Sequence, residues 1–280
     1  MKTMTIAGQT VPALGIGTWH VGEGNATQSQ QEQAALRAGL DAGLTLIDTA
    51  EMYGEGRAET LIGQVLPDYS RENLFVVSKF YPWHATAKLM RQSLLASLHR
   101  LHTDYLDLYL LHWPGTTPIA ETMAGLVALQ KEGLIRAYGV SNFDVADLES
   151  VRAFAKGANL AANEVLYNPT ARGIEYDLLP YQRRHQLPML GYSPFGSGDG
   201  HQIKLTASVQ ALAKAKHLSA HQLLLAWAGR DAVLPLVKTS NPAHMAANLE
   251  ALTATLTPAD EAIIDAAFPA PTAKIALQSL

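Results

Sequence analysis

Eight short apolar segments, each followed by a stretch with helical spacing, constrain the fold of this 280-residue chain more than any other feature. Most are continuous apolar runs rather than strict alternations, which is typical of strands buried on both faces of a parallel sheet. They cover residues 14–19, 44–48, 74–79, 105–113, 135–142, 160–168, 188–195 and 233–238. Eight strands that each lead into a helix, within about 250 residues, predict an α/β fold, a (β/α)8 TIM barrel.

A doubly wound sheet is the alternative fold. It usually carries G-x-G-x-x-G after its first strand, whereas here Gly15 and Gly17 are followed by His20 in place of the third glycine. No linker, low-complexity tract or repeat interrupts the chain, so we expect a single domain over residues 1–280. Residues 4–14 alternate around Gly8, which predicts an N-terminal β-hairpin that caps one end of the barrel.

Helix ends can be located from their capping patterns. Ser29 followed by Glu32 predicts a capping box, and Gly43 is expected to end that helix. Ser219 and Gln222 predict a second capping box. Between residues 86 and 101, helical spacing predicts one apolar face made by Met90, Leu94, Leu98 and Leu101.

Composition excludes several classes of function. With 21 basic and 25 acidic side chains the net charge is −4, which favours neither nucleic-acid nor anionic-membrane binding. Without cysteine there is no thiolate zinc site, iron–sulfur cluster or cysteine nucleophile. His217 and His221 are four residues apart but lack a third ligand, so we expect no metal. No signal-peptide core or apolar run of 18 residues occurs, which predicts a cytoplasmic protein without a membrane span.

Ionisable and hydrogen-bonding side chains stand where the predicted strands end. In a barrel these ends share one face, where the chemistry of such folds is found. Each residue also has a purely structural interpretation, such as a turn cap for Asp48 or an exposed ammonium for Lys79. Together, on successive strands, they predict a site. Its members are Asp48, Lys79, His112, Ser141, Asn142, Tyr192, Ser193, Lys238 and Thr239, with Tyr53 just after the second strand.

Seven sequence blocks carry a resemblance to a known family. They are LGIGTW (14–19), IDTAEMYGEG (47–56), VVSKF (76–80), DLYLLHWP (107–114), IRAYGVSNF (135–143), GYSPFG (191–196) and LVKTSNPAHMAANLEAL (236–252). In this order and at these intervals they resemble the signature blocks of the aldo-keto reductase superfamily, in its short-loop, bacterial form. The resemblance implies a barrel that reduces aldehydes and ketones to alcohols with hydride from NADPH.

The resemblance further implies a catalytic tetrad of Asp48, Tyr53, Lys79 and His112. Tyr53 would give a proton to the substrate carbonyl oxygen. Because a phenol has a pKa near 10, it is a weak acid at neutral pH, and we expect the Lys79 ammonium, held by Asp48, to lower that pKa. His112 would orient the carbonyl as a neutral imidazole.

The same comparison implies which residues hold the substrate and the nicotinamide. Trp19, Tyr81 and Trp113 would form aromatic walls of the substrate pocket beside His112. Glu164 stands where many family members have glutamine, a departure that adds a carboxyl beside the nicotinamide ring. The implied contacts to this end of the cofactor are Thr18, Trp19, Asp48, Ser141, Asn142, Glu164, Tyr192, Ser193, Pro194, Phe195 and Gly196.

The adenosine end can be argued from the residues themselves. Asn241 and Pro242 follow the last strand as an N-cap and a first helical residue, and a helix N-terminus beside Lys238 is a phosphate site. The family resemblance adds Thr239, Ser240, His244 and Asn248 to the cofactor contacts.

His244 replaces the arginine usual in NADP-selective members, and Ala247 a frequent glutamate. We therefore expect a weaker NADPH preference, with NADH as the weaker alternative.

Two other functions compete with the reductase. One is a nucleotide-sensing or scaffolding subunit, since the family includes channel-associated members. The other is a Schiff-base lyase that uses Lys79, which would need a lowered lysine pKa that Asp48 opposes. Short loops at residues 115–118 and 196–204 predict an open pocket for small aldehydes, dicarbonyls such as methylglyoxal, or keto-sugars. A small carbonyl compound is the expected partner and a monomer the expected state.

Overall fold

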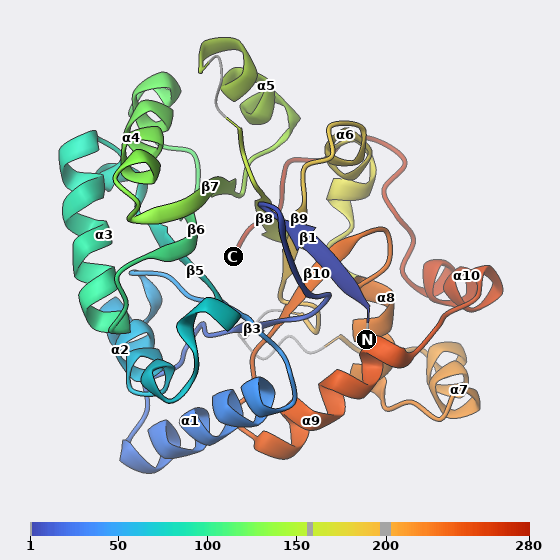
Figure 1. Ribbon diagram of the computed structural model, residues 1–280. Helices are drawn as coiled ribbons and strands as arrows, with labels where there is room; N and C mark the ends of the chain where they lie inside the picture. Colours follow the sequence, from blue (N-terminus) through green and yellow to red (C-terminus); the bar gives the residue numbers. More distant parts are fainter. Residues whose placement is uncertain (1, 156–158, 197–202) are drawn as a thin grey trace.

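Eight parallel strands close into a barrel in the computed structural model, which describes residues 2–155, 159–196 and 203–280 (Figure 1). Each strand pairs with the next in the chain, and the last pairs with the first. The predicted (β/α)8 barrel is therefore confirmed. Its strands are β3 (Gly15–Gly17), β4 (Leu46–Asp48), β5 (Phe75–Phe80), β6 (Leu106–Leu111), β7 (Ile135–Ser141), β8 (Asn163–Leu166), β9 (Met189–Tyr192) and β10 (Val233–Val237).

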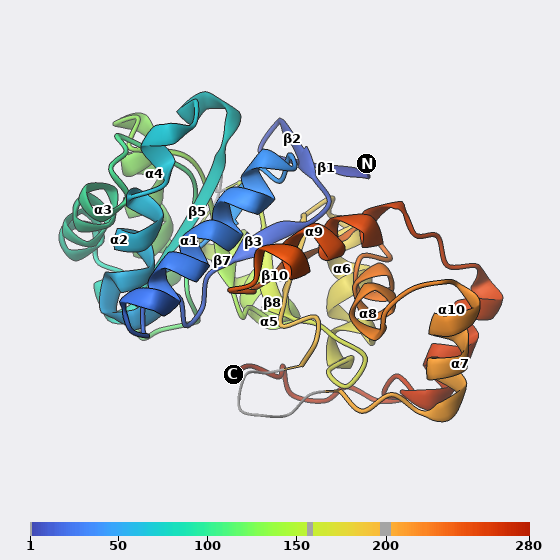
Figure 2. The ribbon, with the colours of Figure 1, turned by 90° about the horizontal axis from the view of Figure 1, so that it is seen from below.

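Helices surround this barrel (Figure 1). The ring is formed by α1 (Ala26–Asp41), α2 (Arg57–Gly63), α3 (Ala87–Leu101), α4 (Ile119–Lys131), α5 (Val145–Phe154), α6 (Leu178–Arg184), α8 (Ala220–Ala228) and α9 (Pro242–Glu250). Two further helices, α7 (Ala207–Ala215) and α10 (Pro258–Ala267), pack against each other outside the ring, as both ribbon views show (Figures 1 and 2). Within the described ranges, no helix has both the length and the apolarity needed to cross a bilayer.

An N-terminal hairpin closes one end of the barrel, as the alternation around Gly8 predicts. Strands β1 (Thr3–Ile6) and β2 (Gln9–Pro12) pair antiparallel. Ala7 and Gly8 connect them with φ values of 50° and 80°, the positive values that a tight hairpin turn requires. The buried side chains of Ile6 and Val11 join the apolar cluster inside the barrel. The end opposite the hairpin is left for the site.

Inside the barrel, side chains change from apolar to polar toward the carboxyl ends of the strands. Because side chains alternate between the two faces of a strand, residues two apart both point inward. In each such pair the first residue in the sequence belongs to the interior apolar cluster, and the second, nearer the carboxyl end of the strand, is polar. The pairs are Leu46 and Asp48, Val77 and Lys79, Leu110 and His112, Ala162 and Glu164, Leu190 and Tyr192, and Leu236 and Lys238.

One predicted capping box is wrong. Helix α1 is capped by Asn25, whose side chain accepts from the Gln28 amide while Gln28 accepts from the Asn25 amide. Asparagine is at least as good an N-cap as serine, so the helix begins before Ser29. Glu32 instead accepts a hydrogen bond from the Gly22 amide.

The other helix-end predictions are confirmed. Ser219 and Gln222 form a capping box at the start of α8. Gly43, with φ 95°, follows the end of α1. The apolar face of α3 is buried at Met90, Leu94, Leu98 and Leu101. Residues 197–202, within the predicted short loop, lie outside the described residues.

Candidate active site

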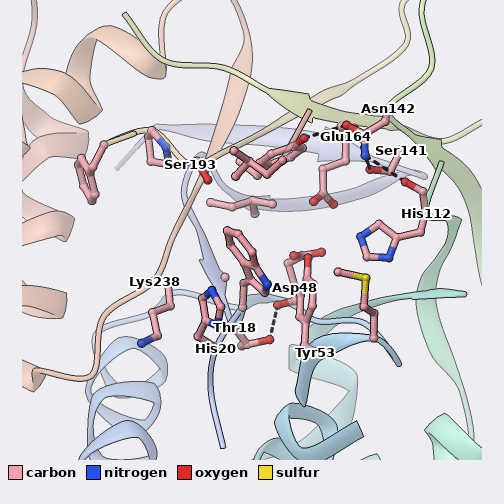
Figure 3. A pocket seen from close by; sticks show the side chains of 18 of the residues that line it. Thr18, His20, Asp48, Tyr53, His112, Ser141, Asn142, Glu164, Ser193 and Lys238 are labelled. Atoms are coloured by element: carbon pink, nitrogen blue, oxygen red, sulfur yellow. Dashed lines mark hydrogen bonds between the residues drawn. The ribbon is translucent and has the colours of Figure 1, made fainter. Parts of the chain in front are cut away.

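A cavity of about 250 Å³ opens at the carboxyl ends of the strands. Its lining includes the end of nearly every strand, so that residues far apart in the sequence face one space (Figure 3). Aromatic and apolar side chains form much of the wall. The predicted residues that line it are Thr18, Trp19, Asp48, Tyr53, His112, Trp113, Ser141, Asn142, Glu164, Tyr192, Ser193, Pro194, Phe195, Gly196 and Lys238.

Lys79 is the fully buried centre of the site. Its Nζ donates to Asp48 Oδ1 at 2.7 Å and Oδ2 at 2.8 Å, and to Tyr53 Oη at 3.1 Å. Burial acts most strongly and lowers the lysine pKa, but the neighbouring Asp48 and Glu164 together raise it well above its usual value. Lys79 therefore stays charged. A lysine that forms a Schiff base needs a lowered pKa, so this shift is in the opposite direction.

The loop after β4 holds Tyr53 at the floor of the cavity. Tyr53 begins a 3₁₀ turn in which Gly54, Glu55 and Gly56 all have positive φ, between 55° and 85°. The two glycines suit this conformation because they have no Cβ to clash. At Gly56 a Cβ would also lie 2.6 Å from the Arg100 side chain. The sequence YGEG thus builds the turn that brings the phenol to Lys79.

The expected net lowering of the phenol pKa is wrong. Burial is the largest influence and raises the pKa of Tyr53, and the charge of Lys79 opposes this without overcoming it. Tyr53 therefore carries its proton at neutral pH. The hydrogen bond from Lys79 remains available to stabilise the phenolate when that proton leaves.

His112 is expected to be neutral, and the structure agrees. The ring is 7% exposed, and burial, with a smaller effect of the Lys79 charge, holds its pKa well below 6.5. It meets the Tyr53 ring edge-on, with centroids 5.8 Å apart. In the described part of the chain, its Nδ1 has no hydrogen-bond partner. A neutral imidazole beside the phenol can thus still bind a polar group.

Two buried carboxyls share the single ammonium. Glu164 Oε1 lies 3.3 Å from Lys79 Nζ, and Glu164 is 1% exposed. Burial and then the charge of Asp48 raise the pKa of Glu164 well above its ordinary 4.5. Burial also raises the pKa of Asp48, against the opposing effect of Lys79. Figure 3 shows the Glu164 side chain pointing toward Asp48 and Tyr53.

Hydrogen-bonded polar groups from β7 to β9 form one wall of the cavity. Asn142, with φ 57°, donates to the His112 carbonyl oxygen at 3.0 Å and accepts from the Tyr192 hydroxyl at 2.8 Å. Ser141 donates to the Glu164 carbonyl oxygen at 3.0 Å. Below them, the Thr18 hydroxyl donates to the Asp48 carbonyl oxygen. These bonds hold the polar groups in place around the cavity.

The start of α9 lies beside the far end of the cavity. Asn241 caps the helix by accepting from the Ala243 amide, and Pro242 is its first residue, as predicted. Lys238 lines the cavity, with its Nζ 3.9 Å from Glu32 Oε1. Of the other predicted residues here, Thr239 and Ser240 are half-buried, Asn248 is buried and His244 is exposed, and none of the four lines the cavity.

Comparison with known proteins shows the family. The model of the aldo/keto reductase family matches residues 13–268. The chain belongs to this family.

Similar proteins include the methylglyoxal reductase YeaE of Escherichia coli, 45% identical over 271 residues that cover 96% of this chain and 95% of that protein. An NADH-specific methylglyoxal reductase of the same organism is 34% identical over 68% of this chain and 65% of its own length. A crystal structure of an aldo/keto reductase from Klebsiella pneumoniae in complex with NADP and acetate has a TM-score of 0.94, with 43% identity, covering 100% of this chain and 99% of that one.

In this aldo/keto reductase the predicted tetrad comes together around Lys79 and the cavity. Tyr81 does not line that cavity. It stacks on Trp83 with centroids 4.2 Å apart and meets Trp113 edge-on at 5.9 Å, so it supports a wall instead of forming one.

Sequence reasoning missed several lining residues of this family member. His20 and Met52 sit next to the predicted Trp19 and Tyr53, and their position in the strand-end loops could have indicated them. Gly17 and Leu236 lie in predicted strands close to predicted site residues and could have been indicated in the same way, whereas nothing in the sequence pointed to Leu280.

Proposed function

We propose that this protein reduces aldehydes and ketones to alcohols with NADPH, and that Tyr53 is the general acid. The proposal rests on one observation: the Tyr53 hydroxyl accepts a hydrogen bond from the Lys79 ammonium, which also donates to both carboxylate oxygens of Asp48. A protonated phenol next to a fixed positive charge is arranged to give up its proton to a developing alkoxide.

The residues around the cavity fit a nicotinamide dinucleotide. Glu164 Oε2 and His112 Nδ1 are buried polar atoms without hydrogen-bond partners in the described residues, next to the polar groups of Ser141 and Asn142. Lys238 and the start of α9 supply positive charge and free amide groups for phosphates. When bound, the reduced nicotinamide supplies a hydride to the carbonyl carbon.

The protein's own groups handle the proton. Tyr53 donates it to the carbonyl oxygen, and Lys79 stabilises the resulting phenolate through the hydrogen bond already present. Asp48 keeps Lys79 charged and positioned. His112, neutral because it is buried beside a cation, offers an N–H to the same oxygen. The phenolate then regains a proton from solvent.

Small aldehydes, dicarbonyls such as methylglyoxal, or keto-sugars are the proposed substrates. The cavity presents Trp19, Met52 and Trp113 to a substrate that approaches Tyr53. The relative in Escherichia coli that matches over nearly the full chain is named a methylglyoxal reductase. Contacts with apolar side chains such as these discriminate weakly among similar aldehydes.

NADPH is the proposed cofactor, with NADH as a weaker alternative. Lys238 is the only lysine or arginine among the predicted phosphate contacts, and His244 lacks the bidentate fork of an arginine. One relative is named NADH-specific, and the similar Klebsiella pneumoniae structure is a complex with NADP, so both cofactors occur among similar proteins.

The test is steady-state oxidation of NADPH, then NADH, with methylglyoxal and a panel of small aldehydes. Tyr53→Phe should reduce kcat/KM by about 10²- to 10⁴-fold while NADPH still binds. Tyr105→Phe, which removes a phenol hydroxyl next to Arg71 outside the cavity, is the matched control and should keep its activity. Unchanged turnover in Tyr53→Phe would refute the assignment of the acid. Binding of NADPH without turnover of any carbonyl would favour a nucleotide sensor, and borohydride trapping of substrate on Lys79 would favour a lyase.

A further inference from the structure

Glu164 gives this site one more carboxyl than a single lysine can neutralise. Asp48 and Glu164 both contact Lys79, and all three side chains are at most 4% exposed. If both carboxyls were ionised, the cluster would hold a net negative charge away from water. Two close carboxyls avoid this by keeping one proton between them.

The contacts show which carboxyl keeps the proton. Asp48 receives two short hydrogen bonds from Lys79, at 2.7 and 2.8 Å, which favour its ionised form. Glu164 has a single, longer contact with Lys79 at 3.3 Å, and its Oε2 has no partner in the described residues. The proton therefore resides mainly on Glu164, which lines the cavity as Asp48 does.

We propose that Glu164 carries a proton until an oxidised nicotinamide enters the cavity, and that it then releases this proton to solvent, so that oxidised cofactor binds more tightly as the pH rises. The inference rests on the proposed nicotinamide site. Its physical basis is the ring charge, because an oxidised nicotinamide is a cation and a reduced one is neutral. A nearby cation stabilises a carboxylate, whereas a neutral ring does not.

Other titratable groups face Glu164 or the same cavity, and the effect of Glu164 on cofactor binding has to be distinguished from theirs. Lys79 and Asp48 form one ion pair, and the pKa of the Tyr53 and Tyr192 phenols is raised by burial. His112 is held neutral, whereas His20 is half-exposed at the cavity edge and shares a hydrogen bond with Glu23. Within the described residues these groups are Asp48 from β4, Tyr53 from the following turn, Lys79 from β5, His112 beyond β6, Tyr192 from β9, His20 and Lys238 at the mouth, and the carboxyl group of Leu280.

The direction and size of the effect follow from proton linkage. Binding that releases one proton strengthens by up to about tenfold for each pH unit across the window in which Glu164 titrates. The phosphates belong to both forms of the cofactor. Their own titration therefore cancels in the ratio of the NADPH to the NADP⁺ dissociation constant, and that ratio isolates the charge on the ring.

The experiment measures both dissociation constants between pH 6.5 and 8.5, from the quenching of tryptophan fluorescence, since Trp19 and Trp113 line the cavity. In the unaltered protein the NADPH-to-NADP⁺ ratio should rise by at least about threefold over this range. In Glu164→Gln, which keeps the shape and cannot ionise, it should be flat. Glu132→Gln, an exposed carboxyl paired with Arg91, is the matched control and should behave as the unaltered protein does.

A second measurement avoids any variant. Calorimetric titration of the unaltered protein in two buffers of different ionisation enthalpy counts the protons released, and NADP⁺ should release more than NADPH. A ratio that is flat in the unaltered protein, or that still rises in Glu164→Gln, overturns the inference, and in the second case the proton is released from another group. If neither cofactor binds, the proposed function itself fails.

Discussion

Replacing Asp48 with asparagine should destabilise the protein far more when Glu164 is also replaced by glutamine than when Glu164 is kept. Lys79 is fully buried, and Asp48 is its closest partner: Lys79 Nζ donates to Asp48 Oδ1 at 2.7 Å and to Oδ2 at 2.8 Å. Removing one partner of a buried ion pair ordinarily leaves an uncompensated charge. Here Glu164 lies 3.3 Å from the same ammonium and can ionise in place of Asp48.

The magnitudes follow from counting the charges that remain. In Asp48→Asn alone, Lys79 keeps one carboxylate and loses about one hydrogen bond's worth of stability, roughly 1–2 kcal/mol. In Asp48→Asn combined with Glu164→Gln, the ammonium has no counter-charge, and breaking a buried pair in this way costs about 3–5 kcal/mol. Because Glu164→Gln alone is not expected to destabilise the protein at pH 7, the two substitutions should be coupled by at least about 2 kcal/mol.

Urea unfolding at pH 7 of the four proteins in this cycle measures that coupling. The cycle comprises the unaltered chain, each single variant and the double variant, with unfolding followed by far-ultraviolet circular dichroism. Effects that add to within about 0.5 kcal/mol would refute the reasoning, because they would mean that Glu164 does not share the charge of Lys79 with Asp48.

Three further predictions use other features of the molecule. Because a Cβ at Gly15 would lie 2.6 Å from two leucine side chains inside the barrel, Gly15→Ala should cost about 1–3 kcal/mol in urea unfolding. Gly17→Ala, whose nearest contact is 3.7 Å, should cost much less, and equal losses would contradict the packing argument. His244→Arg should raise the NADPH-to-NADH ratio of kcat/KM about tenfold, mainly through KM, and an unchanged ratio would show that this position does not meet the 2′-phosphate. Glu164→Gln should gain stability over the unaltered chain as the pH rises above 4.5, the ordinary pKa of a glutamate, by up to about 1.4 kcal/mol per pH unit until the raised pKa is reached. The sign follows because the folded protein keeps a proton that the unfolded chain has lost, and a pH-independent difference in thermal or urea unfolding would contradict it.

The barrel and the position of its site could be predicted because both depend on local patterns. Apolar runs locate the strands, and in a parallel barrel all strand ends face the same way, so Asp48, Lys79 and His112 had to meet. The start of α1 was wrong by about one turn because Asn25 and Ser29 both have good N-cap chemistry. Each is also followed three residues later by a possible capping-box partner, Gln28 or Glu32, so the sequence alone does not decide between them.

The electrostatics of the site could not be predicted in the same way, because they depend on burial as well as on neighbours. From the sequence, Lys79 beside Tyr53 suggests a lowered phenol pKa, whereas enclosure of the phenol outweighs that charge. Glu164 raises the same problem. A glutamate in place of a glutamine suggests an added negative charge, yet with Asp48 already paired to Lys79, burial keeps a proton on it. A protonated carboxyl has an O–H donor and an acceptor oxygen, so it can both donate and accept, as a glutamine amide can. What the glutamate adds is a proton that can leave.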